Sequence, residues 1–95
     1  MVKHIVFFRL KDRSAESIER AAAVLRAMEG KIEFLREIEV GVDFLRSPRS
    51  YDIALITVFD SREDLERYQA HPAHQPVSEY MSEVRESSVS VDFEC

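Results

Sequence analysis

The sequence predicts an α+β domain of the ferredoxin-like type, in which a four-stranded antiparallel sheet carries helices on one face. Three observations predict it. Apolar residues alternate along four segments, as in strands, and recur every three or four residues in the segments between them, as in helices. The order of the segments is β-α-β-β-α-β, the split βαβ pattern. Because the chain has 95 residues, we expect one domain over residues 1–95.

The first strand is predicted from Val2 to Leu10 and is apolar on both faces. We expect one face to turn toward the helices, and its side chains are Val2, His4, Val6, Phe8 and Leu10. Ser14 is a predicted N-cap for the helix that follows. The apolar residues of this helix at helical spacing are Ile18, Ala22, Leu25 and Met28, and Gly30 is expected to end it.

A hairpin occupies the middle of the chain. Its strands are predicted over Ile38–Phe44 and Tyr51–Phe59, with the loop at Ser47–Ser50. The second of these strands is again apolar on both faces. We expect Ile53, Leu55 and Phe59 to lie on one face, and Ala54, Ile56 and Val58 on the other.

The last third of the chain is predicted to form two helical segments and a strand. Ser61 to Asp64 resembles a capping box and opens a short helix that carries Leu65 and Tyr68. Pro72 disfavours helical geometry at His71 and interrupts this helix. A second segment is expected over Ala73–Val84, with Pro76 in its first turn. Alternation of Val89, Val91 and Phe93 with polar residues predicts the final strand.

The strands with two apolar faces predict a homodimer. Helices cover one face of a ferredoxin-like sheet, so the other face would expose a large apolar patch, which monomers rarely tolerate. We expect a second copy to cover it by packing sheet against sheet around a two-fold axis. The patch comprises Ile5, Phe7, Ala54, Ile56 and Val58.

Composition argues against several classes of partner. The formal net charge is −5, with acidic and basic residues interspersed, so we expect no nucleic-acid partner. No stretch approaches the roughly 18 apolar residues of a membrane span, and Lys3, His4 and Arg9 interrupt any signal-peptide pattern. The single cysteine, Cys95, is the last residue, which excludes an internal disulfide. We therefore expect a cytoplasmic protein with no membrane partner.

Four side chains are candidates for chemistry: His4, Tyr68, His71 and His74. If they converge between the sheet and the helices, the histidines can exchange protons near neutral pH and the phenol can orient a carbonyl. Each also has a structural interpretation. His4 can be a hydrogen-bonded core residue, Tyr68 can be core packing, and His71 can shape the turn before Pro72.

A metal site is a weaker interpretation of the same histidines. His71 and His74, joined by His4, could be read as zinc ligands, but no fourth ligand follows in a recognisable spacing. The sequence also lacks a phosphate-binding glycine loop, a nucleophile elbow and an HExxH motif. We therefore expect neither a metal nor a cofactor.

Along its whole length the sequence resembles the stress-responsive A/B-barrel domain family, or Dabb. The segments that carry the resemblance are Val2–Val6, Leu10–Asp12, Tyr51–Leu55, Tyr68-Gln69-Ala70-His71-Pro72-Ala73-His74 and Val91–Phe93. The resemblance implies a ferredoxin-like protomer whose sheet pairs with that of a second copy in a dimeric α+β barrel. It agrees with the argument from the two-faced strands.

The resemblance also suggests an activity. A plant polyketide cyclase of the family closes a linear polyketide by aldol condensation, and its catalytic tyrosine and histidine match Tyr68 and His74. Its first-strand histidine matches His4, whereas another pocket histidine falls at Ile53. By this resemblance His74 would be the general base of a cyclase- or isomerase-like enzyme, with Tyr68 as hydroxyl donor and His4 and His71 as ligand-binding residues.

Three functions therefore remain open at the level of sequence. The first is a dimer that binds a small, partly apolar carbonyl compound between sheet and helices, with or without cyclase-like catalysis. The second is a stress-associated structural or interaction dimer without a cavity. The third is a monooxygenase that works without a cofactor.

Overall fold

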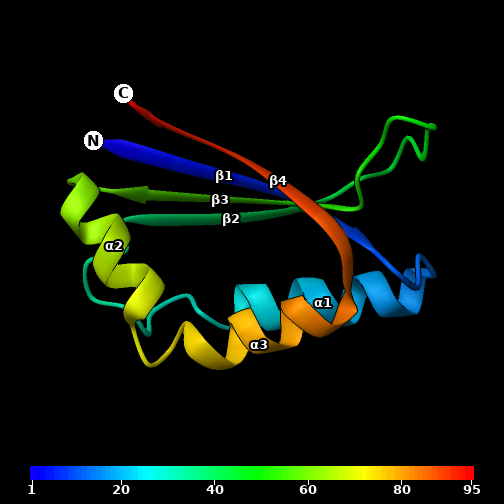
Figure 1. Ribbon diagram of the computed structural model, residues 1–95, viewed down its shortest axis with the longest axis horizontal. Helices are drawn as coiled ribbons and strands as arrows, with labels where there is room; N and C mark the ends of the chain where they lie inside the picture. The colour runs from blue at the N-terminus through cyan, green and yellow to red at the C-terminus, as the bar shows by residue number, and fades with distance from the viewer.

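The computed structural model describes residues 1–95, and its fold is the predicted ferredoxin-like one. The sheet is antiparallel with strand order β2-β3-β1-β4, and the helices lie on one side of it (Figure 1). The elements in chain order are β1 Val2–Leu10, α1 Ala15–Arg26, β2 Glu37–Val42, β3 Ile53–Phe59, α2 Arg62–Ala70, α3 Gln75–Val84 and β4 Arg85–Glu94.

The core lies between the helices and the two central strands. Leu10, Ile53 and Phe59 are fully or almost fully buried on the sheet side. From α1 the buried residues recur at helical spacing, because one face of the helix packs on the sheet; they are Ile18, Ala21, Ala22 and Leu25. None of the helices is long and apolar enough to cross a membrane.

The predicted helix caps are confirmed, whereas some boundaries differ. The hydroxyl oxygens of Ser14 and Ser61 accept hydrogen bonds from the backbone N–H groups of Ser17 and Asp64. The helix predicted to end at Gly30 ends at Arg26 instead, because residues 27–31 form tight turns; Gly30 lies at the last of these bends with a positive φ of 79°.

The break between α2 and α3 is confirmed at His71. The backbone of His71 is extended, with ψ of 139°, as the proline that follows it favours. Helix α3 begins at Gln75, two residues later than predicted, with Pro76 in its first turn. Its last residue, Val84, is followed at once by the first residue of β4 (Figure 1).

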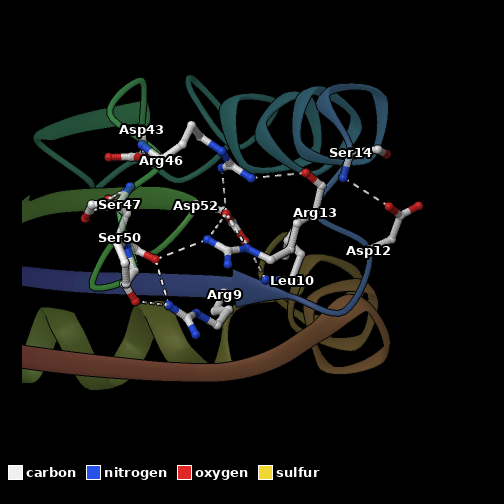
Figure 2. A network of polar contacts seen from close by, with 11 residues as sticks. Arg9, Leu10, Asp12, Arg13, Ser14, Asp43, Arg46, Ser47, Ser50 and Asp52 are labelled. Carbon is white, nitrogen blue, oxygen red and sulfur yellow. Dashed lines mark hydrogen bonds and ion pairs between the residues drawn. The ribbon is translucent and has the colours of Figure 1, made fainter.

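The hairpin strands are shorter than predicted, because residues 43–52 form a long loop. This loop rises on the side of the sheet away from the helices (Figure 1). Its base is held by Asp52, whose buried carboxylate accepts hydrogen bonds from Arg13, Arg46 and the backbone N–H of Leu10 (Figure 2). Asp52 was predicted to be part of a strand. It precedes β3 instead, and its side chain is buried where Arg13 and Arg46 bind it.

The face of the sheet opposite the helices is apolar across three strands. Register places Phe7 between Ala54 and Val89, and Ile5 between Ile56 and Val91. Val91 is 62% exposed and Phe7 is 42% exposed, so the predicted open patch exists and extends onto β4. We call these six residues the open face. Val58 lies on the same side of the sheet, as expected, but it is 5% exposed and adds no open surface, because Lys3 and Glu37 flank it in register.

Candidate functional site

Tyr68 lies at the centre of the region between the sheet and the helices. Helix α2 points it inward, and it is 1% exposed. Its ring centroid is 5.0 Å from that of Phe59 and 4.5 Å from that of His74. The hydroxyl group donates only to the sulfur of Met28, at 3.8 Å, and a thioether is a weak acceptor. The phenol is thus buried with capacity to donate a stronger hydrogen bond.

His74 lies in the turn that opens α3. It occupies the N-cap position of α3 without a hydrogen bond from its side chain to that helix. Burial lowers the pKa of His74, and the charges of His4 and His71 act in the same direction, while a backbone hydrogen bond with Gln69 opposes them. Burial also raises the pKa of Tyr68 to about 12. At neutral pH a neutral imidazole therefore lies beside a protonated phenol.

Tyr68 and His74 line the same cavity, which has a volume of about 200 Å³. Its walls come from β1, β3, β4 and all three helices. The apolar lining residues are Phe8, Leu25, Met28, Leu55, Val77 and Met81, and the remaining polar ones are Ser78, Ser82, Arg85 and Ser88. Two groups suited to proton transfer and hydrogen bonding thus face a small space with both apolar and polar walls.

His4 lies next to this cavity without lining it. Its side chain is buried on the covered face of β1, and its ring meets that of Tyr68 edge-on at a centroid distance of 6.3 Å. Its Nδ1 forms a hydrogen bond with the carboxylate of Asp92 on β4. The predicted position of His4 between sheet and helices is confirmed, and it contacts the site through Tyr68.

Sequence reasoning did not single out Asp92 as the partner of His4. The two residues are directly opposite each other in the β1–β4 register. The signal that could have found the pair is the alternation of the last strand, which turns Asp92 away from Val91 and Phe93 and toward the face that holds His4. A carboxylate on Nδ1 fixes the tautomer and orientation of an imidazole.

The structure does not bring His71 into the cavity. Its Nδ1 accepts a hydrogen bond from the backbone N–H of Ala73, and its Nε2 lies 3.8 Å from a carboxylate oxygen of Glu33. Its ring packs against Phe34. These contacts hold the turn between α2 and α3, and so they position His74. No group of three or more His, Cys, Asp or Glu side chains is arranged to hold a metal ion.

A second cavity, of about 410 Å³, lies between α2 and β4. Its lining is largely polar and includes Arg62, Glu66, Gln69, Asp92 and Glu94. It lacks Tyr68 and His74. Of these two cavities, only the smaller one combines an apolar wall with the phenol and the imidazole.

The sheet order and the cavity under the helices define a ferredoxin-like α+β protein with a space for a small molecule on the covered side. The chain belongs to the Stress responsive A/B Barrel Domain family, Dabb, whose sequence profile matches residues 2–95. An uncharacterised protein of Streptomyces coelicolor is 37% identical over 78 residues, which cover 79% of this chain and 80% of that protein.

Two solved structures are similar along almost the whole chain. A dimeric protein of unknown function with a ferredoxin-like fold from Bacteroides fragilis is 34% identical, with a TM-score of 0.82, over 99% of this chain and 95% of that one. A hydroxynitrile lyase from Passiflora edulis is 22% identical, with a TM-score of 0.81, over 97% of this chain and 90% of that one. At 22% identity, the similarity to the lyase shows only that the two chains share a fold.

Proposed function

We propose that this Dabb protein is a homodimer that binds a small, partly apolar carbonyl compound in the cavity lined by Tyr68 and His74. The observation that carries the proposal is the pairing of these two side chains at a ring-centroid distance of 4.5 Å beside a cavity of about 200 Å³. The phenol has only a sulfur as acceptor. A carbonyl oxygen would give it a stronger one.

The pair has the properties that abstraction of a proton next to a carbonyl requires. His74, kept neutral by its lowered pKa, accepts the proton from the carbon beside the carbonyl and becomes an imidazolium. Tyr68, kept protonated by its raised pKa, donates a hydrogen bond to the carbonyl oxygen as that oxygen gains negative charge. The imidazolium then returns the proton, either to the same carbon or to another.

A cyclase-like reaction begins with the same proton abstraction and then forms a carbon–carbon bond. The enolate carbon attacks a second carbonyl of the same molecule and forms a carbon–carbon bond, and the resulting alkoxide takes the proton from the imidazolium of His74. All atoms and charges balance without a cofactor. His4, which forms a hydrogen bond with Asp92, packs edge-on against the ring of Tyr68.

The dimer half of the proposal rests on the open face. Six apolar side chains of β3, β1 and β4 lie there in register, and all six are at least partly exposed. A patch of this kind favours association with a second sheet. The relative from Bacteroides fragilis, 34% identical to this chain, is described as dimeric. Because the cavity lies on the other side of the sheet, the dimer leaves it accessible.

Exchange of hydrogen for deuterium next to a carbonyl tests the proposed chemistry without knowledge of the natural substrate. Methyl propyl ketone and cyclohexanone are incubated with the protein in D₂O, and loss of the α-proton signals is followed by NMR. We expect the wild-type protein to accelerate exchange, His74→Ala to abolish the acceleration, and Tyr68→Phe to reduce it roughly tenfold or more.

Thermal unfolding of each variant is measured alongside the exchange rate. If exchange with the wild-type protein is no faster than in buffer, and His74→Ala merely lowers the unfolding temperature, the catalytic proposal is wrong. That outcome favours the structural dimer, in which His71 and His74 serve to fix the turn between α2 and α3.

A further inference from the structure

A β-bulge at the start of β4 turns Arg85 toward the cavity. Ser88 pairs with Phe8 and Arg85 pairs with Leu10, so three steps along β4 match two steps along β1. Phe8 and Leu10 share the covered face of the sheet. With regular alternation, Ser88 and Arg85 would lie on opposite faces, because they are three residues apart. The extra residue places both of them on the covered face.

The backbone of Arg85 is fixed at the junction of α3 and β4. It caps α3, and its N–H donates to the carbonyl of Met81. The neighbouring carbonyl of Val84 accepts a hydrogen bond of 2.9 Å from the N–H of Lys11. The side chain is held as well, because its Nη1 donates to the hydroxyl of Ser88 at 2.7 Å. The guanidinium is therefore directed by backbone, register and side chain together.

The guanidinium of Arg85 has no acidic partner. It forms no ion pair with a carboxylate of the chain, whereas Arg36 pairs with Asp60 and Arg62 pairs with Glu94. Arg85 lines the cavity of Tyr68 and His74 together with Ser78, Ser82 and Ser88. The cavity thus joins a cationic, hydroxyl-rich rim to an apolar wall and a phenol–imidazole pair.

We propose that the ligands of this cavity are short oxo acids, whose carboxylate binds Arg85 while their carbonyl group meets Tyr68. The inference rests on the proposed function and names the class of ligand. An unpaired guanidinium offers a fork of N–H donors that matches a carboxylate. The small volume of about 200 Å³ lies below the range of about 300–1,000 Å³ for drug-sized ligands, so short chains fit best.

Because the protein is negatively charged overall, a preference for ligands with a carboxylate would point to a local cationic group. The formal net charge is −5, so long-range electrostatics repel an anion, and a preference for one must come from a local group. A carboxylate that bound elsewhere on the surface would not depend on Arg85. It would not depend on a ketone group in the same molecule either.

Three probes of equal chain length separate the contributions: levulinate has both groups, methyl propyl ketone lacks the carboxylate, and valerate lacks the ketone. Dissociation constants are measured by protein-observed NMR for the wild-type protein and for Arg85→Gln, Arg85→Lys and Tyr68→Phe. We expect levulinate to bind the wild-type protein about tenfold more tightly than methyl propyl ketone, since a charge-assisted hydrogen bond to an exposed guanidinium contributes about that much.

Arg85→Gln is expected to remove this difference, and Arg85→Lys is expected to retain only part of it, because lysine keeps the charge but lacks the fork of N–H donors. Added salt should weaken the binding of levulinate and leave the affinity for methyl propyl ketone unchanged. Equal affinity of levulinate and methyl propyl ketone for the wild-type protein, or a preference that persists in Arg85→Gln, overturns the inference. Thermal unfolding of each variant confirms that the comparison is between folded proteins.

If the proposed function is wrong, these affinity measurements give a different result. If levulinate binds no more tightly than valerate, and Tyr68→Phe changes neither, the carbonyl makes no contact with Tyr68 and the proposed function is wrong. A loss of affinity in Arg85→Gln would still support the assignment of the anionic group. Conversely, exchange of ketone protons that depends on His74 but not on Arg85 supports the proposed function while the levulinate comparison decides the ligand class.

Discussion

The ring of Tyr68 lies 4.5 Å from the ring of His74, centroid to centroid, with the two planes inclined by 55°. One residue comes from α2 and the other from the turn before α3, so the helix break at His71 and Pro72 sets their separation. Burial moves their two pKa values apart, lowering that of His74 and raising that of Tyr68. Groups whose environments separate their pKa values in this way are suited to acid and base roles.

Tyr68→Phe should separate function from stability. The variant removes a hydroxyl whose partner is the sulfur of Met28 at 3.8 Å, so we expect the free energy of unfolding to change by less than about 1 kcal/mol. Exchange of ketone α-protons should nevertheless slow. Chemical denaturation and the exchange assay measure the two effects.

Tyr68→Ala provides the contrast, because it leaves a cavity in place of a fully buried ring. We expect it to cost about 3–5 kcal/mol. If Tyr68→Phe is as destabilising as this, the hydroxyl has a structural partner and its proposed role as a free donor is wrong.

Protonation of His74 should destabilise the fold. The pKa of His74 is lowered below its ordinary value of 6.5, so the unfolded chain takes up this proton at a higher pH than the native protein does. The stabilising contribution is fully present above pH 6.5 and is lost as pH falls through the folded pKa. NMR titration of the His74 ring protons measures the folded value, and denaturant unfolding at several pH values measures the stability.

His74→Gln is the matched variant for this measurement, since glutamine keeps polarity without titrating. We expect it to show a weaker loss of stability between neutral pH and mild acid than the wild-type protein. An unchanged pH profile in His74→Gln would mean that another group causes the loss.

Asp52→Asn should weaken the base of the long loop. Burial opposes ionisation of the Asp52 carboxyl group, but hydrogen bonds from Arg13, Leu10 and Arg46 together outweigh it and lower its pKa (Figure 2). Asparagine keeps the shape and leaves the arginines without their counter-charge. Since both guanidinium groups reach solvent, we expect a loss of about 2–3 kcal/mol, below that for a fully buried pair.

The same lowered pKa gives a pH dependence in the acid range. The contribution of the Asp52 carboxylate is present above the unfolded pKa of about 3.9 and is lost as pH falls through the lower, folded pKa. Unfolding by urea, measured from neutral pH to strong acid, should show a smaller acid-dependent loss in Asp52→Asn. Arg49→Gln, in the same loop without a contact to Asp52, is the control.

Local signals in the sequence predicted much of this fold. Ser14 and Ser61 could be identified as caps, because capping depends on neighbours three residues away. The two-faced strands predicted the buried and open sides of the sheet, because alternation fixes which side chains share a face. These properties depend on residues close together in the chain.

The remainder depended on partners far along the chain. The carboxylate of Asp52 is buried because Arg13 and Arg46 reach it, and strand alternation carries no sign of them. The link between His4 and Asp92 needs the pairing of the first and last strands. The direction of Arg85 needs a bulge, which adds a residue to the register and leaves no mark in hydrophobic periodicity.

Val91→Lys should dissociate the proposed homodimer. Val91 is 62% exposed on the part of the open face that β4 contributes, opposite Ile5 in register. In a two-fold dimer the substitution buries two like charges without partners, which costs more than the lost apolar contact. We expect sedimentation velocity at micromolar concentration to show a dimer for the wild-type protein and a monomer for Val91→Lys.

Ser90→Lys is the matched control, because it adds the same charge to the neighbouring residue on the opposite face of β4. If both variants sediment as the wild type does, the open face is not the interface. If both dissociate, charge on β4 acts regardless of face, and packing of sheet against sheet loses its support.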